Sequence, residues 1–353
     1  MEHGKKLLAW VEQGVSQGAS DLHLVEGVQP VIRVSGRLTP LLSEEKLDTA
    51  AIRGILAAML SEADVARFLE KKEHDFSWSA SENARFRGNA YFERGHIGVA
   101  LRFIPREIRN IAELNLPPIV EDFAAHEQGF FLVVGPVGQG KTTTLAALLE
   151  KINQTRSEHI VTIEDPIEYL FENKQSYIDQ REVRIDTNDF ETAMANVFRQ
   201  DIDVLMIGEM RTPETIATAV TAAETGHLVF STLHTNSAAQ TIDRIIDTFP
   251  ANQQDQIRLQ LSASLVGIFS QRLVPRISGG LIPACELLLN TNAIANLIRE
   301  KRTHEIQTMI ETGSEQGMID MNRSLAAMVQ AGEITVETAY QHSWNPKTLE
   351  RLL

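Results

Sequence analysis

A glycine-rich loop supplies the residues of this chain with the clearest chemical meaning. Residues 135–142 read G-P-V-G-Q-G-K-T, which fits the pattern G-x-x-x-x-G-K-[ST] of phosphate-binding loops. Glycines let the backbone wrap closely around an anion, with its N–H groups pointing inward. The pattern predicts that Lys141 reaches the β- and γ-phosphates of a nucleotide and that the Thr142 hydroxyl ligates Mg²⁺. The residues expected at the phosphates are Gly135, Pro136, Val137, Gly138, Gln139, Gly140, Lys141, Thr142 and Thr143.

The residues on both sides of this loop fit its use. Residues 130–134 (FFLVV) form a continuous apolar run, as in a parallel strand buried on both faces. Leu145, Leu148, Leu149 and Ile152 then recur with helical spacing. A strand, a glycine loop and a helix N-terminus in this order favour anion binding. The sequence therefore predicts a nucleoside triphosphate site rather than a chance glycine-rich turn.

Polar residues follow three further apolar runs. Glu164 follows residues 160–163, Glu209 follows residues 204–207, and His234 ends the run that begins at His227. The carboxyl ends of parallel strands share one sheet edge, so these side chains are expected near the phosphates. We expect Glu209 to hold Mg²⁺ through a water molecule and Glu164 to orient or deprotonate the attacking water.

The histidines and arginines are weaker candidates when taken alone. His234 has the residue type to donate a hydrogen bond to a γ-phosphate, although a histidine at a strand end is more often satisfied by the backbone. His227 is a weaker candidate than His234. Arg85 and Arg87 share one face of an expected strand, and Arg94 and Arg102 follow. Arginines neutralise charge in phosphoryl transfer, but exposed strand arginines usually only aid solubility.

The composition of the chain narrows the classes of protein to which it can belong. With 353 residues, 43% of them apolar and 23% charged, the chain is expected to form roughly two domains of a soluble globular protein. A net charge of −14 argues against broad nucleic-acid binding. No apolar run reaches the ~18 residues of a membrane span, so no direct membrane insertion is expected. The single cysteine, Cys285, excludes a disulfide framework and is expected to be a small buried side chain.

The hydrophobic patterns divide the chain into two parts. Residues 1–105 alternate short helical and strand-like segments, as in a small α+β domain. Helices are expected at 5–15 and, with a break near Ser61, at 47–71; strands are expected at 20–24, 30–34, 75–78, 84–92 and 98–104. Residues 106–118 end in a double proline and are expected to form an extended linker and hinge.

From residue 119 the chain alternates strands and helices, as in a parallel α/β sheet. Thr212, Pro213 and Gly226 predict the start and end of one helix, and Pro250 stops another that carries Ile242 and Ile246 on one face. We expect a helical C-terminal part from about residue 285.

Several longer motifs occur in order along nearly the whole chain. They are SDLHL (20–24), RFRGN (85–89), TIEDPIEY (162–169), QREV (180–183), GEMR (208–211) and ETGHLVFSTLHTNSA (224–238). Together with the phosphate loop, they make the chain resemble the PilT-type secretion-superfamily ATPases, the retraction motors of type IV pili.

The resemblance implies a fold and an assembly. It implies a PAS-like α+β domain at residues 1–105 and a RecA-like P-loop ATPase domain at residues 119–353. It implies a homohexameric ring that binds ATP and Mg²⁺, and mechanical work passed to an inner-membrane pilus platform protein. It allows a second retraction ATPase as a further partner. The implied location is cytoplasmic, with peripheral attachment to the inner membrane through the pilus machine.

The resemblance also gives roles to single residues. It places Lys141 and Thr142 at phosphate and Mg²⁺, Glu164 in catalysis and Glu209 at the end of the Walker B strand. His227 and His234 match the family's His box. Arg85, Arg94 and Arg102 match N-domain arginines that complete sites for hydrolysis.

The chain departs from the family pattern at a few positions. Val137 and Gln139 replace Thr and Ser in the phosphate loop, and Thr212 replaces Asp after GEMR. Ala295 replaces the first arginine of the retraction signature A-I-R-N-L-I-R-E, although the apolar face of that helix is kept. These changes spare the glycines, the lysine and the hydroxyl that phosphate binding requires.

Three other functions compete with a retraction motor. One is a PilU-like accessory motor, and another is a pilus-assembly or type II secretion ATPase. The latter usually carry a long extra N-terminal region and often a tetracysteine module, whereas this chain has about 100 residues before the hinge and one cysteine. The third is a nucleotide-binding scaffold without hydrolysis, which the retained Lys141, Thr142, Glu164, Glu209 and His234 disfavour.

Overall fold

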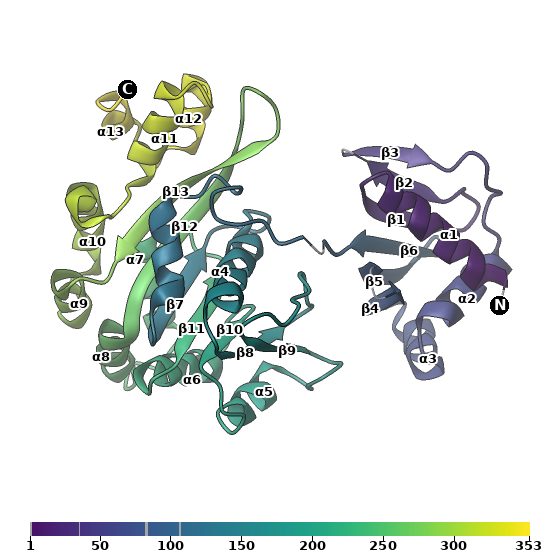
Figure 1. Ribbon diagram of the computed structural model, residues 1–353, viewed down its shortest axis with the longest axis horizontal. Coiled ribbons are helices and arrows are strands. Elements are labelled where there is room, and N and C mark those ends of the chain that lie inside the picture. The colour runs from purple at the N-terminus through teal and green to yellow at the C-terminus, as the bar shows by residue number, and fades with distance from the viewer. Residues whose placement is uncertain (1, 35, 82–83, 106) are drawn as a thin grey trace. The chain divides into compact units, whose positions relative to one another are not determined.

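Two separate sheets organise the chain (Figure 1). The computed structural model describes residues 2–34, 36–81, 84–105 and 107–353. One compact unit consists of the residues before Glu107 together with Glu168–Leu170, and the other consists of Glu107–Ile167 and Phe171–Leu353. Both units combine helices with strands, so the expected mixed α/β class holds.

The N-terminal sheet has six antiparallel strands in the order β3–β2–β1–β6–β5–β4. They are β1 (Ala19–Val25), β2 (Val31–Val34), β3 (Arg37–Pro40), β4 (Glu73–Ser81), β5 (Ala84–Glu93) and β6 (His96–Phe103). Three helices supply the rest of the core: α1 (Glu2–Ser16), α2 (Thr49–Met59) and α3 (Glu62–Lys71). Leu22, Phe86 and Leu101 point from alternate strand positions into this core, so the opposite face of the sheet carries the polar residues.

The expected elements of this unit are confirmed. Ser61, where a break was expected, is the N-cap of α3 and accepts a hydrogen bond from the Asp64 N–H. After residues 30–34, the sequence Ser35-Gly36 predicts a hairpin turn, but Ser35 lies outside the described residues.

The second sheet has seven strands in the order β13–β12–β7–β11–β10–β8–β9. They are β7 (Gly129–Val134), β8 (His159–Glu164), β9 (Tyr177–Glu182), β10 (Val204–Ile207), β11 (Leu228–Leu233), β12 (Leu265–Pro275) and β13 (Leu281–Leu289). All neighbouring pairs are parallel except β12 with β13, which is antiparallel. The carboxyl ends of β7, β11, β10 and β8 therefore meet at one edge.

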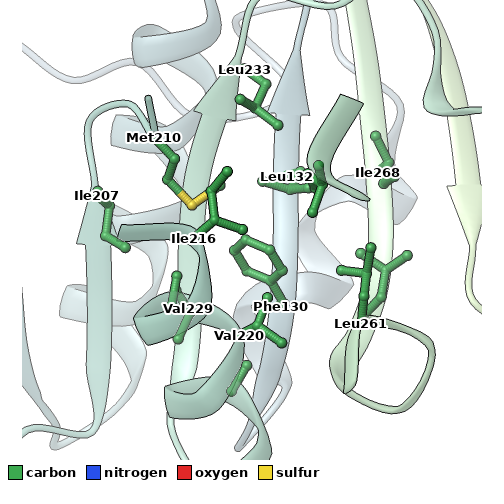
Figure 2. Close-up of a cluster of buried hydrophobic side chains, with 14 of the residues drawn as sticks. Phe130, Leu132, Ile207, Met210, Ile216, Val220, Val229, Leu233, Leu261 and Ile268 are labelled. Carbon is green, nitrogen blue, oxygen red and sulfur yellow. The ribbon is translucent and has the colours of Figure 1, made fainter. Parts of the chain in front are cut away.

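Helices cover both faces of this sheet. On one face lie η1 (Pro118–Ala125) and α4 (Lys141–Thr155), packed against Phe131, Val133 and Phe230. The other face carries α5 (Phe190–Val197), α6 (Pro213–Glu224), α7 (Ala238–Asp247), α8 (Gln254–Ser264), α9 (Asn292–Arg299) and α10 (Ile306–Thr312). Figure 2 shows this second core, in which Phe130 and Leu132 lie among Ile216, Val229 and Leu261.

The C-terminal residues form a smaller cluster of their own. Two short turns, η2 (Thr303–Glu305) and η3 (Gly313–Gln316), lead to α11 (Met321–Gln330), α12 (Val336–His342) and α13 (Pro346–Glu350). These helices pack on the outer parts of β12 and β13 through Val274, Ile282 and Leu325. The helical part begins at Asn292 and not near residue 285, because β13 continues to Leu289.

The expected linker at residues 106–118 is largely packed. Ile111 and Leu116 are buried in the core beside α4. Pro118 occupies the first turn of η1, where its missing N–H costs nothing. The double proline thus starts a helix instead of forming an extended hinge, and the expectation of a linker reaching residue 118 was wrong.

Candidate active site

The phosphate loop lies between β7 and α4, as its sequence predicted. Gly135, Gly138 and Gly140 have positive φ values of 149°, 77° and 80°. Gly135 also lies against the backbone of β12, since a Cβ there would be 2.5 Å from the Gln271 carbonyl oxygen. This position requires glycine for both reasons.

Lys141 connects the loop to the neighbouring strand end. Its side chain is buried, and its Nζ donates to the carbonyl oxygens of Gly135 and Pro136, each at 2.9 Å. Nζ also lies 3.2 Å from Nδ1 of His234. An ammonium only donates, so Nδ1 must accept and the neutral imidazole carries its proton on Nε2.

That Nε2 faces the Walker B glutamate. It lies 3.5 Å from one carboxylate oxygen of Glu209, and the other oxygen forms an ion pair with Arg211. Lys141, His234, Glu209 and Arg211 thus form a continuous polar chain at the ends of β7, β11 and β10. A cavity of about 570 Å³ adjoins it, and its lining includes Glu209, Arg211 and His234 as well as residues of α7.

Glu164 ends β8, and Glu209 follows the end of the neighbouring strand β10. The Glu164 side chain is only 3% exposed. One carboxylate oxygen accepts hydrogen bonds from the Thr162 hydroxyl at 2.6 Å and from Nε2 of Gln180 on β9 at 3.2 Å. These donors hold the carboxylate in one orientation, which suits a residue that must align a water molecule.

Thr142 has the freedom that a metal ligand needs. It lies in the first turn of α4, and among the described residues its hydroxyl has no hydrogen-bonding partner. The described part of the chain contains no cluster of three or more histidine, cysteine or acidic residues that could bind a metal alone. A site with so few protein ligands, such as the Thr142 hydroxyl, fits Mg²⁺. This ion usually takes one or two protein oxygens and completes its shell with phosphates and water.

His227 lies away from these residues. It precedes the first residue of β11, at the opposite edge of the sheet from His234. Its Nδ1 is 3.1 Å from the Ala222 carbonyl oxygen, and its ring packs edge-on against Phe198. Within this unit, the structure does not bring His227 to the phosphate loop.

Two of the three candidate arginines lie near one another. Arg102 is next to Arg87 across the β5–β6 pair, and Arg85 lies two residues further along the same face of β5. Arg102 Nε donates to the buried Asp21 carboxylate at 2.9 Å. Burial alone would raise the pKa of Asp21, but hydrogen bonds from Ser20 and Arg102 bring it below its usual value. Arg94 instead sits in the β5–β6 turn with a φ of 50° and a largely exposed side chain.

Two hydrogen bonds that support the site were not expected from the sequence. Gln271 on β12 accepts from the Thr144 hydroxyl at 2.7 Å, and Gln139 accepts from the Leu273 N–H at 2.6 Å. These bonds fasten the phosphate loop to β12, and they account for Gln139, which departs from the family pattern. The only available signal was the polar run Ser270-Gln-Arg272 inside an apolar segment.

Comparisons with known proteins show which family this chain resembles. The family model described as "Type II/IV secretion system protein" matches residues 83–350. The type IV pilus retraction ATPase PilT of Pseudomonas aeruginosa is 41% identical over 94% of this chain and 96% of its own length. The type IV pilus ATPase PilU of the same organism is 39% identical over 100% of this chain and 91% of its own length.

A solved structure is also similar. The crystal structure of the pilus retraction motor PilT with bound ADP is 43% identical and superposes with a TM-score of 0.91, covering 98% of both chains. In the described part of this chain, no helix has the length and apolar character needed to cross a bilayer. The chain belongs to the type II/IV secretion system protein family and, within it, to the PilT-type ATPases.

Proposed function

We propose that this protein is a homohexameric motor that hydrolyses ATP to ADP and phosphate and uses the energy to retract type IV pili. One observation carries the proposal. Lys141 of the phosphate loop, His234, Glu209 and Glu164 converge from four strands on one sheet edge. The similarity to pilus retraction ATPases supplies the mechanical role.

Each residue has a task in hydrolysis. Lys141 and the backbone N–H groups of residues 137–143 bind the β- and γ-phosphates. Glu164 orients a water molecule and accepts its proton as the water oxygen attacks the γ-phosphorus and the bond to the β–γ bridging oxygen breaks. His234 donates from its ring to the γ-phosphate. Thr142 and, through a water molecule, Glu209 would hold Mg²⁺, which would neutralise phosphate charge when bound.

The two units take the roles that the family resemblance implies. We assign the N-terminal unit as the PAS-like domain and the C-terminal unit as the RecA-like ATPase domain. Arg85 and Arg102 share a polar sheet face, which suits contact with phosphates, whereas Arg94 lies at the far end of the hairpin. We assign His227 a different role from His234, because the two residues lie at opposite ends of β11.

The motor needs partners. The proposed assembly is a ring of six copies that acts on an inner-membrane pilus platform protein, with a second retraction ATPase as a further partner. Nucleic acid is not a proposed partner, because the net charge of −14 opposes broad contact with phosphates.

Phosphate release by the purified protein tests hydrolysis. The wild type should release phosphate from ATP with Mg²⁺, while Glu164→Gln and Glu209→Ala should each lower kcat by about 100-fold or more. Glu337→Gln, on the exposed surface of α12, is the matched control. Equal rates for all four proteins would leave a nucleotide-binding scaffold as the better description.

Deletion of the gene tests the direction of the motor. Excess surface pili with loss of twitching motility are expected, and the wild-type gene but not Glu164→Gln should reverse both. Bald cells would assign the protein to pilus assembly. Normal pilus numbers with weakened retraction would assign it to an accessory, PilU-like role.

A further inference from the structure

Glu286 is a buried acid that the proposed reaction does not use. It lies on β13 opposite Ser270 of β12 and is fully buried. One of its carboxylate oxygens accepts a hydrogen bond from the Ala238 N–H at 2.8 Å. A buried carboxylate is costly unless it makes contacts of this kind, so its position needs an explanation.

Ala238 is the first residue of α7, directly after the segment that carries His234. Ser237 caps this helix by accepting from the Gln240 N–H. Glu286 thus binds one of the N–H groups that α7 leaves unpaired at its start. The positive end of the helix dipole also favours an acceptor there.

Two further residues fix the same segment from β12. The Ser270 hydroxyl donates to the Asn236 carbonyl oxygen at 2.8 Å, and Arg272 donates to the Asn236 side chain at 2.8 Å. The His234–Ala238 segment is therefore attached to β12 and β13 on one side. On its other side, His234 contacts Lys141 and Glu209.

Glu286 also has neighbours in the C-terminal helices. Burial raises the pKa of Glu286 to about 8, and the nearby carboxylates of Asp320 and Glu311 also favour the protonated form, whereas the hydrogen bond from the Ala238 N–H opposes this shift. Asp320 is the N-cap of α11 and accepts from Gln307 of α10. The protonated acid and a glutamine have the same shape and a similar acceptor oxygen, which makes glutamine the conservative replacement.

We propose that Glu286 is a positioning residue that holds His234 in place for its contact with the γ-phosphate. The hydrogen bond from the Ala238 N–H to Glu286 fixes the segment that carries His234. This inference rests on the proposed function, in which His234 contacts the γ-phosphate. Glu286 acts through His234 and does not touch nucleotide. Its loss should therefore reduce discrimination between ATP and ADP while leaving ADP affinity unchanged.

The test measures the dissociation constants of ADP and of a slowly hydrolysed ATP analogue on the full chain with Mg²⁺. The discrimination ratio is the dissociation constant of ADP divided by that of the ATP analogue. It should fall roughly five- to tenfold in Glu286→Ala, the loss expected for one buried hydrogen bond, and remain near the wild-type value in Glu286→Gln. Glu150→Ala removes another buried glutamate, bonded to Asn153 and Gln154 on α4, and is the control for a general loss of stability.

Ala238→Pro provides a second route to the same hydrogen bond. Proline removes the donor, is accepted at the first position of a helix, and suits the extended backbone of Ser237 before it. It should lower the ratio as Glu286→Ala does. This variant keeps the inference testable where Glu286→Ala does not fold.

A double-mutant cycle with His234→Ala separates the two hypotheses. Glu286→Ala should add no further loss of discrimination when His234 is already alanine. An additive loss in the double variant, or an unchanged ratio in Glu286→Ala, would overturn the role of Glu286. An unchanged ratio in His234→Ala alone would instead overturn the role of His234 in the proposed function.

Discussion

The residues of the phosphate loop show how tightly one position can be specified. Gly135 combines a φ of 149° with a neighbouring backbone oxygen that a Cβ would approach to 2.5 Å. Because a backbone atom cannot rotate away as a side chain can, the loop and β12 must separate to admit a methyl group. Gly279, with a φ of 93° and open space around it, carries only the backbone strain.

We therefore expect Gly135→Ala to cost several kcal/mol of unfolding free energy and to abolish nucleotide binding. Gly279→Ala should cost about 1–2 kcal/mol and leave binding unchanged. Guanidinium unfolding and ADP titration measure the two effects. Similar losses of stability in both variants would argue against the close contact with β12.

Glu286 gives stability a defined dependence on pH. Burial raises the pKa of its carboxyl from 4.5 to about 8, so the folded chain holds this proton more tightly than the unfolded chain. The stability that the folded chain gains from holding this proton is fully present below pH 4.5 and is lost as the pH rises to about 8. Glutamine does not titrate. The unfolding free energy of Glu286→Gln should therefore rise relative to that of the wild type by up to about 1.4 kcal/mol per pH unit across this window.

Glu150→Gln is the control for this measurement. Burial would raise the pKa of Glu150, but hydrogen bonds from Lys174, Gln154 and Asn153 bring it below 4.5. Its contribution is lost only as the pH falls, so its difference from the wild type should stay flat between pH 5 and 8. Unfolding midpoints at four pH values suffice, and two flat profiles would show that Glu286 does not titrate there.

The sequence predicted the residues that lie in short motifs. Glu164, Glu209 and His234 lie at or just after the ends of apolar runs, and Lys141 ends the glycine loop that follows a fourth such run; the parallel sheet brings these run ends together. Cys285 is buried as expected, and burial raises the pKa of its thiol to about 12. Gln271 and Glu286 were not predicted, because their contacts join positions 127 and 48 residues apart.

Among the elements, helix α6 tests how the chain tolerates a departure from its family. Thr212 stands where the family carries aspartate, and its hydroxyl accepts from the Thr215 N–H at 3.3 Å. Aspartate and threonine are both good N-caps, and aspartate also favours the positive end of the helix dipole. Pro213 at the first helical position further fixes the start.

Thr212→Ala should therefore lower the unfolding free energy by about 1 kcal/mol, whereas Thr212→Asp should be neutral or slightly stabilising. Chemical denaturation of the two variants against the wild type measures this difference. A loss on going to aspartate that equals the loss on going to alanine would mean that the cap does not stabilise α6.

Strands whose apolar residues follow one regular spacing could be predicted from the sequence, but the pair β12 and β13 at the edge of the larger sheet could not. Helix α9 (Asn292–Arg299) has the apolar face expected of the retraction signature, and Ala295 is buried beside Ile294 and Leu297. Strand β12 and strand β13 escaped prediction because β12 interrupts its apolar run with Ser270, Gln271 and Arg272. Those polar side chains are kept by contacts to the phosphate loop and to Asn236, which no local pattern encodes.

At the scale of the whole molecule, the proposed ring predicts that sites are shared between copies. Arg102 belongs to the N-terminal unit and Lys141 to the C-terminal unit. If Arg102 serves the phosphate of a neighbouring copy, Lys141→Ala and Arg102→Ala rings lack different halves of each site. Mixed rings of the two variants would then regain some complete sites.

We expect each variant alone to hydrolyse ATP at least about 100-fold more slowly than the wild type. A mixture reassembled in equal parts should recover a measurable fraction of the rate. Mixing Lys141→Ala with Glu164→Gln is the control, because both changes lie in the same unit and no complete site can form. No recovery in the first mixture would place Arg102 at the nucleotide of its own chain.

The strand order of the larger sheet also sets when the site can appear during folding. Gly129 pairs with Leu228, and Phe130 with Leu265, so β7 acquires its two neighbours only from segments 99 and 135 residues later. Such long loops must close before their contacts stabilise anything, which makes this a slow step. On a ribosome, the phosphate loop would emerge early yet remain unable to hold nucleotide until β12 has followed. ATP then binds and stabilises finished chains only, so the ligand itself distinguishes a completed subunit from a partial one.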